Sequence, residues 1–188
     1  MDWLQFFAAL IDSLAWPAAV AGSIFIFREK LVELLPRLRV KYKDAEVNFR
    51  LEQAEKEAEA LPPPPEDAPE PTPEEKSRFE QVAEISPRAA MLEVRTEIEV
   101  AVRDLAKAAN LLSPKVQSTL GLTRLLRSRG LIKPHTSALL DHLRVLGNDA
   151  AHDMGTEYSV DDALRYRELA NRAITQLLQV QSIIDDDD

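Results

Sequence analysis

The sequence predicts an all-α protein with an apolar N-terminal helix, a short juxtamembrane element, a proline-rich linker and a C-terminal antiparallel helical bundle. Glycine occurs five times in 188 residues and aromatic side chains make up 6% of the chain, whereas Ala, Leu, Glu and Arg recur in long runs. Apolar residues repeat at helical spacing in the C-terminal half. Most of the predicted helices there begin at a Ser or Thr that can cap them.

Residues 3–27 form an apolar run whose single charge is Asp12, within a predicted anchor at 1–27. At 1.5 Å per residue, this run is long enough to cross a hydrocarbon core of about 30 Å. A signal peptide is the alternative, since small residues at 19–21 resemble a cleavage site, but a basic segment before the run is missing. Basic residues follow at 28–43, so the N-terminus is predicted outside and the rest cytoplasmic, in a single-pass protein of a bacterial inner membrane.

Residues 28–60 are predicted to form a juxtamembrane element. Residues 28–39 place four leucines on one face of an amphipathic stretch that would lie on the anionic inner leaflet. After it, apolar and polar residues alternate, which predicts a short β-hairpin turning near Asp44, followed by a charged helix. The alternating apolar residues are Val40, Tyr42, Val47, Phe49 and Leu51.

Residues 61–75 are predicted to be a disordered linker. The stretch from Pro62 to Glu75 holds seven prolines and five carboxylates in fourteen residues, so it cannot form a core. It is expected to be an extended spacer that tethers the following domain, although it also contains a PxxP pattern.

Residues 76–184 are predicted to form the bundle, and 185–188 an acidic tail. A long helix from Pro87 to Leu111 and a last helix from Ser159 to about Ile184 carry the clearest apolar stripes. The stripes are Met91, Val94, Ile98, Val102, Leu105, Ala109 and Leu112 in the first, and Ala163, Tyr166, Ala170, Ile174, Leu177 and Val180 in the second. The predicted helix starts are Thr72–Pro73, Ser86–Pro87, Ser113–Pro114, Lys133–Thr136 and Ser159 with Asp162, and the third helix ends near Gly130.

The stretch LRVLGNDAAHDMG, residues 143–155, places Gly147 inside a predicted helix. A helical glycine costs about 1 kcal/mol relative to alanine, so this position indicates close approach of another backbone or a polar site. Asn148 and His152 are four residues apart and share a helix face, with Arg144 one turn before. Such a stripe either holds a phosphate near a basic His or consists of structural groups with satisfied hydrogen bonds.

LRVLGNDAAH near the end of the fourth helix and SVDDALRYRELANRAI opening the fifth resemble the HEPN superfamily, in particular a membrane-anchored bacterial branch of HEPN-like domains of unknown function. The resemblance covers residues 87–184. It implies a dimer and, in active members, metal-independent RNA cleavage at the dimer interface. Asn148 and His152 match the polar residue and the His of that site. The Arg position falls on Gly147, so Arg144 would have to supply the cation.

Binding residues are also predicted around this turn and in a basic cluster. Gly147 and Asp149 belong to the turn, and the cluster consists of Arg124, Arg127 and Arg129, which either complement a helix end or contact RNA phosphates. The chain has no Cys, and its three His are not spaced as metal ligands, so no metal and no cofactor are predicted. The net charge of −9 argues against nucleic-acid binding by the surface as a whole.

The functional prediction is a membrane-anchored, dimerising binding and regulatory module, placed in stress or phage defence by family analogy alone. The first alternative is a membrane-tethered, metal-independent endoribonuclease that uses Arg144, Asn148 and His152. The second is a membrane scaffold that recruits a protein partner. The expected partners are therefore membrane lipid, a second copy of the chain, and either RNA or another protein.

Overall fold

The computed structural model describes residues 45–65, 71–113, 118–153 and 155–187, together with a few positions between 3 and 26. The chain divides into two units, Met1–Tyr42 and Lys43–Asp188. The predicted spanning segment 3–27 lies almost entirely outside the described residues. Within the part of the chain that is described, no helix combines the length and the apolar character needed to cross a membrane.

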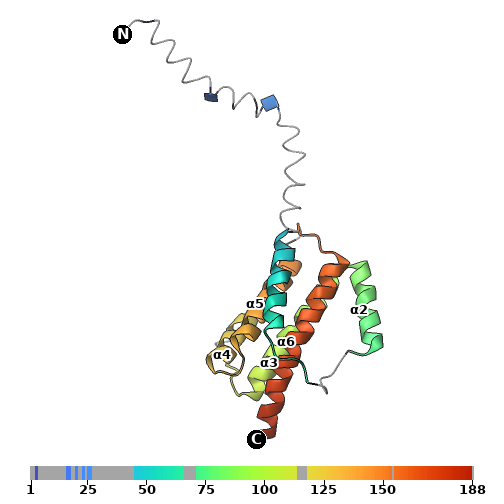
Figure 1. Cartoon of the computed structure of the whole chain (residues 1–188), viewed down its shortest axis with the longest axis vertical. Helices are drawn as coiled ribbons and strands as arrows, with labels where there is room; N and C mark the ends of the chain where they lie inside the picture. The colour runs from blue at the N-terminus through green and yellow to red at the C-terminus, as the bar shows by residue number, and fades with distance from the viewer. Residues whose placement is uncertain are drawn as a thin grey trace. The chain divides into compact units, whose positions relative to one another are not determined.

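The second unit is all-α, as predicted (Figure 1). No strand occurs in its described residues. Its first helix covers residues 45–59. The others are α2 (Pro73–Ile85), α3 (Pro87–Ala108), α4 (Thr119–Ser128), α5 (Pro134–His152) and α6 (Val160–Asp187).

The helix starts follow the predicted caps with one exception. Thr72 and Glu75 form a capping box at α2, and the Ser86 hydroxyl accepts a hydrogen bond from the N–H of Ala89 at α3. At α6 the Ser159 hydroxyl accepts from the N–H of Asp162, whose carboxylate accepts in return from the Ser159 N–H. The exception is α4. It begins at Thr119, with Ser118 as its cap, and not at the predicted Ser113–Pro114.

The apolar stripes of α3 and α6 form the centre of the core, as predicted. Met91, Val94, Ile98, Val102 and Leu105 are buried on α3, and Ala163, Tyr166, Ala170, Ala173 and Leu177 on α6. Leu112 is 48% exposed, because α3 ends at Ala108 and the predicted heptad stops there.

The helices do not all run antiparallel. The guanidinium of Arg88, at the start of α3, lies over the ring of Tyr158 just before α6, and further along both helices Glu97 pairs with Arg167. α3 and α6 therefore run parallel, so the prediction of an antiparallel bundle is wrong for this pair. The prediction holds for α3 and α5, which run antiparallel, because Arg88 at the start of α3 also donates to the carbonyl of Ala150 at the end of α5. The chain reaches the parallel arrangement by returning through α4 and α5.

The predicted β-hairpin is wrong for residues 45–51, which are helical. Val47 and Leu51 are buried and four residues apart, whereas Phe49 between them is 59% exposed. Their spacing fits both a strand and a helix, and the burial of Ala54, Ala58 and Leu61 continues the helical stripe. Residues 40–44, the other half of the predicted hairpin, lie outside the described residues.

The helix at 45–59 packs against α6. Arg165 on α6 donates to Glu55 at 2.8 Å and to Asn48 at 3.1 Å, and Arg172 donates to the carbonyl of Ala58 at 3.2 Å. α2 contacts α6 as well, through Phe79 beneath Arg167. The proline-rich segment therefore joins two helices of the same unit. It is a connection inside the domain and not the predicted spacer ahead of it.

Leu51→Ala and Phe49→Ala distinguish the helix from the predicted hairpin. In the unit Lys43–Asp188, Leu51→Ala should lower the free energy of unfolding by about 2–5 kcal/mol, because it leaves a cavity, whereas Phe49→Ala should change it by under about 1 kcal/mol. Urea denaturation followed by circular dichroism measures both. Equal losses would show that the two side chains share a buried face, as a strand requires.

Candidate functional site

Gly147 lies buried where α5 meets both α6 and α3. A Cβ atom at this position would lie 2.9 Å from Oη of Tyr166 and 3.0 Å from Cδ of Arg95. The Tyr166 side chain is fully buried, and its hydroxyl donates to the carbonyl oxygen of Leu143 at 3.0 Å. Burial raises the pKa of Tyr166, so the phenol keeps the proton that it donates. The glycine is thus explained by the close approach of two neighbouring helices.

Arg88 fixes the end of α5 and the loop that follows. Its guanidinium donates to the carbonyl oxygens of Asp153 at 2.9 Å and Thr156 at 2.7 Å, and also to that of Ala150. Carbonyls at the end of a helix lack donors within the helix, so the arginine satisfies groups that would otherwise need water. The same guanidinium lies 5.4 Å from the centre of the Tyr158 ring.

The loop between α5 and α6 is further held by its own side chains. The Asp153 carboxylate accepts from the N–H of Gly155 at 2.9 Å and from the hydroxyl of Thr156 at 3.1 Å. Thr156 is buried. Together with Arg88, these bonds give a fixed turn after His152, the last residue of α5.

Among the described residues, no hydrogen bond or ion pair joins the three predicted catalytic residues to one another. Arg144 donates through Nε and Nη2 to the Asp141 carboxylate, at 3.0 and 2.8 Å. His152 is exposed and Asn148 is half-buried. Arg144 and His152 are eight residues apart, which is about 12 Å along a helix axis. The stripe exists as predicted, but its only cation is paired with a neighbour.

Asp149 and Tyr158 form the other polar part of this corner. Both side chains are half-buried. Burial, and secondly the negative charge of Asp149, raise the pKa of Tyr158, which stays protonated. The Tyr158 hydroxyl is shielded from solvent and has no hydrogen-bond partner among the described residues.

The predicted basic cluster belongs to a different part of the unit. Arg124, Arg127 and Arg129 are exposed on α4 and at its end, ahead of α5. His152 closes α5, whose 19 residues span about 27 Å. The structure therefore separates the predicted binding residues into two places. Within the described ranges, no three metal-ligating side chains come together.

Sequence reasoning missed the residues that shape the corner: Arg88, Arg95, Asp141, Tyr158 and Tyr166 as a hydrogen-bond donor. The sequence does contain signals for two of these residues, Arg88 and Asp141. Arg88 lies in the first turn of α3, where the helix dipole disfavours a cation, so its charge has to be used by another element. Asp141, three residues before Arg144, is within reach on the same helix face.

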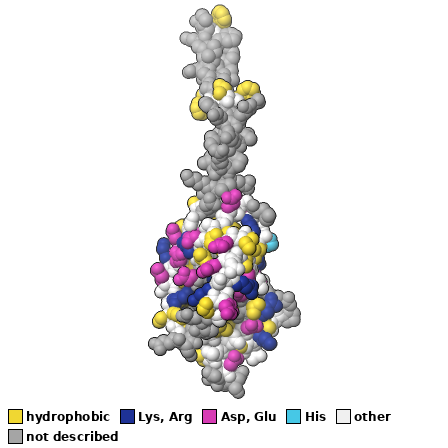
Figure 2. Space-filling view, turned by 90° about the vertical axis from the view of Figure 1, so that its right-hand side faces the viewer, with side chains coloured by type: hydrophobic (Ala, Val, Ile, Leu, Met, Phe, Trp, Pro, Cys, Tyr) yellow, Lys and Arg dark blue, Asp and Glu magenta, His cyan; other side chains and the backbone are white. Residues whose placement is uncertain are grey.

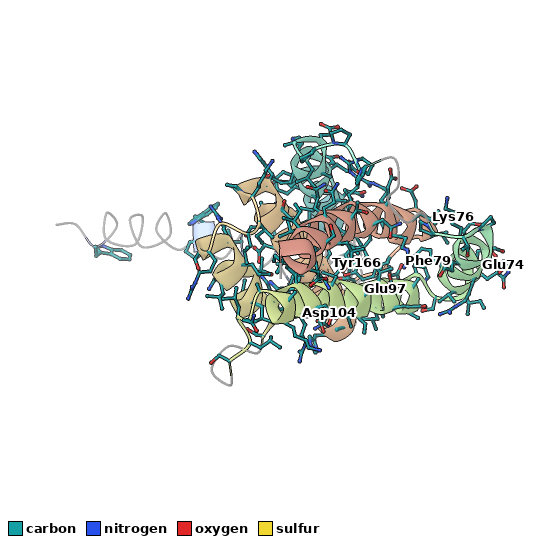
Figure 3. The ribbon with its side chains drawn as sticks, turned by 90° about the horizontal axis from the view of Figure 1, so that it is seen from below. Glu74, Lys76, Phe79, Glu97, Asp104 and Tyr166 are labelled. Carbon is teal, nitrogen blue, oxygen red and sulfur yellow. The ribbon has the colours of Figure 1, made fainter. Side chains whose placement is uncertain are left out.

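Among the pockets that open along α6, two grooves face α2 or α3. One, of about 440 Å³, is lined by Phe79, Leu164 and Arg167; the Arg167 guanidinium lies 5.2 Å from the Phe79 ring and donates to both oxygens of Glu97. Figure 3 shows Phe79 extending from α2 toward the α3–α6 pair. The other groove lies between α3 and α6 and has an apolar floor, with Glu97 and Asp104 on its lining. Neither groove includes a residue of the α5 turn.

Comparison with known protein families gives a match to a family of unknown function. The sequence model of a family described as Domain of unknown function (DUF4145) matches residues 77–183, more than half of the chain. No curated protein and no solved structure matches. The matched range contains α3, α4 and α5 and most of α2 and α6, and it excludes the helix at 45–59.

Gly147→Ala tests the close approach at the turn. Alanine gains about 1 kcal/mol of helix propensity, but displacing Tyr166 and Arg95 should cost more, for a net loss of about 1–2 kcal/mol in stability. Tyr166→Phe removes the nearest atom, so the double variant should lose less than the sum of the single ones. Urea denaturation of the four proteins measures this coupling. A Gly147→Ala protein more stable than wild type would contradict it.

Arg88→Met tests the clamp on the end of α5. The variant keeps most of the side-chain length but loses the donors to three carbonyls, so the amides of residues 151–158 should exchange with solvent at least about tenfold faster. Hydrogen–deuterium exchange with mass spectrometry measures this locally. Arg103→Met is the matched control, because Arg103 is exposed on the same helix. Unchanged protection in Arg88→Met would show that the loop holds itself.

Proposed function

The chain belongs to the DUF4145 family, and from this premise we propose that it is a membrane-anchored helical module that dimerises and acts by binding, in a regulatory role. We further propose that its helical unit is related to the HEPN superfamily, and that the chain serves in bacterial stress or phage defence. The proposal is one of docking and not of RNA cleavage.

The anchor is supported by the sequence. Residues 3–27 contain a single charge, and basic residues follow them at 28–43. With an anchor there, the N-terminus faces outward across a bacterial inner membrane, and the unit beginning at Lys43 lies in the cytoplasm. The tether is then formed by residues 28–44, because the proline-rich segment joins helices within the unit.

The observation that carries the proposal is that each arginine of the α5 corner is already engaged. Arg144 pairs with Asp141, Arg95 pairs with Glu99 at 2.9 Å, and Arg88 is bound to carbonyls. Cleavage of a phosphodiester requires a cation near the developing charge. The position where the HEPN motif has its arginine is Gly147, whose surroundings are filled by Tyr166 and Arg95.

The same corner is suited to docking. His152 is exposed and Asn148 half-buried beside a turn that α3 holds in place. A surface fixed in advance loses little conformational entropy when a partner binds. The partner in this proposal is a second copy of the chain, which would place two such turns against each other.

The test uses the unit Lys43–Asp188 as wild type, as His152→Ala and as the control His142→Ala. Wild type should sediment as a dimer, and His152→Ala should weaken the dimer by about tenfold, as expected for one interface residue of moderate weight. His142→Ala should leave it unchanged. None of the three should cleave structured or single-stranded RNA in the absence of metal.

Two results would contradict the proposal. RNA cleavage by wild type that is lost in His152→Ala would support the metal-independent endoribonuclease. A unit that stays monomeric at all concentrations would remove the dimer and leave a membrane scaffold that recruits a different protein.

A further inference from the structure

The cations of this acidic chain are not distributed evenly. The stretch 105–140 contains six Lys or Arg residues and no Asp or Glu, although the chain as a whole carries a net charge of −9. It covers the last turn of α3, the whole of α4 and the first turns of α5. This stretch of the chain therefore has a charge opposite in sign to that of the molecule, and the one carboxylate bonded to it among the described residues is Glu57, at His135.

The cations of this stretch that the structure describes have no carboxylate partner among the described residues. Five of the six lie in the described part of the chain, all are exposed, and none forms an ion pair there. Arginines on the other helices are mostly paired, as in Arg78 with Glu93 and Arg167 with Glu97. We call the five the α4 basic surface: Lys107, Arg124, Arg127, Arg129 and Lys133.

The opposite side of the unit has a different character. Figure 2 shows the face over α2, where acidic side chains are interspersed with basic and apolar ones. α4 lies on the other side in Figure 1. An anionic surface is therefore attracted at α4, and the net negative charge of the rest of the chain disfavours approach from other directions.

We infer that the α4 basic surface docks on the anionic phospholipid headgroups of the membrane in which the chain is anchored. The inference rests on the anchor proposed above. The 17 residues of 28–44 reach at most about 60 Å when extended, so the tether keeps α4 near the bilayer. Each unpaired Lys or Arg side chain near an anionic leaflet raises the equilibrium constant for membrane docking by about a factor of five.

Lipid is favoured over nucleic acid by the other side chains present. No Phe, Tyr or Trp occurs between Phe79 and Tyr158, so the region has no aromatic side chain on which unpaired bases could stack. Leu112, in the connection between α3 and α4, is 48% exposed. An exposed apolar side chain in the same stretch of the chain as these cations suits the boundary between headgroups and acyl chains.

The experiment uses the full chain reconstituted into vesicles. The chain has no Cys, so Ser128→Cys at the exposed end of α4 can carry a single environment-sensitive fluorophore. In phosphatidylcholine vesicles with about 30% phosphatidylglycerol the emission should shift to the blue, and in pure phosphatidylcholine it should not. Salt at about 0.5 M should reverse the shift by screening.

A matched pair of variants locates the effect. Arg124→Gln with Arg127→Gln should reduce the ratio of docked to undocked protein about 30-fold, because two headgroup contacts are lost. Lys56→Gln with Lys76→Gln makes the same change in net charge at exposed positions elsewhere and should leave the ratio unchanged.

Failure of the anchor and failure of the basic surface give different results. Flotation with neutral vesicles tests the anchor alone, since the α4 cations have no anionic lipid to bind. Identical emission with neutral and anionic vesicles, or equal effects of the two variant pairs, would overturn the inference. Binding of a short RNA that depends on Arg124 and Arg127, without any shift on anionic vesicles, would assign the surface to nucleic acid and overturn it as well.

Discussion

The hydrogen bond from the Tyr166 hydroxyl to the carbonyl of Leu143 sets how closely α6 approaches α5. A buried phenol needs a partner, and in this structure a Cβ atom at the facing position 147 would lie too close to the Tyr166 hydroxyl for this bond, so that position requires a residue without a side chain. Gly147 meets that requirement, and the space beside it is filled by the stem of Arg95 from α3. Three helices are thus held together at one point, and the turn after α5 takes its position from them.

The arginines of this chain serve three different purposes. Arg88 binds backbone carbonyls, which makes its contribution independent of neighbouring side chains. Arg144 and Arg167 pair with carboxylates on the surface, where an ion pair contributes about 1 kcal/mol at most. Those of α4 have no protein partner in the described residues and keep their full charge for an external one. Composition alone does not distinguish these roles, because each role depends on which groups face the guanidinium in the folded chain.

Sequence reasoning predicted the features that depend on neighbours along the chain. The caps at Thr72, Ser86 and Ser159 and the apolar stripes of α3 and α6 are local patterns with local causes. Residues 45–51 were predicted as a strand because Val47 and Leu51 satisfy both a strand and a helix period, whereas the charged helix predicted after them is present. The partners of this helix on α6 are more than 100 residues away in sequence. The parallel direction of α3 and α6 was missed for a similar reason: it depends on the path of the whole chain.

In the candidate site, too, the features set by spacing along one helix were predicted, and those that depend on other helices were not. Helical spacing placed Asn148 and His152 on one stripe, and Gly147 was predicted to mark either close approach of another backbone or a polar site. What the spacing could not provide was the occupant of that space, since Tyr166 and Arg95 come from other helices. The clamp by Arg88 joins residues more than 60 positions apart and has no local pattern apart from a cation at a helix start.

The proline-rich connection has a consequence for the integrity of the chain. It joins the helix at 45–59 to α2, and both helices also reach α6 through side-chain contacts. A single proteolytic cut between residues 61 and 71 would leave all of these contacts in place and yield a complex of two polypeptides. The N-terminal piece would then remain associated through buried side chains, the bonds from Arg165 and Arg172, and the contact between Glu57 and His135 on α5. Its buried side chains are Val47, Leu51, Ala54, Ala58 and Leu61. Covalent attachment to the N-terminal segment would become a reversible equilibrium that depends on concentration.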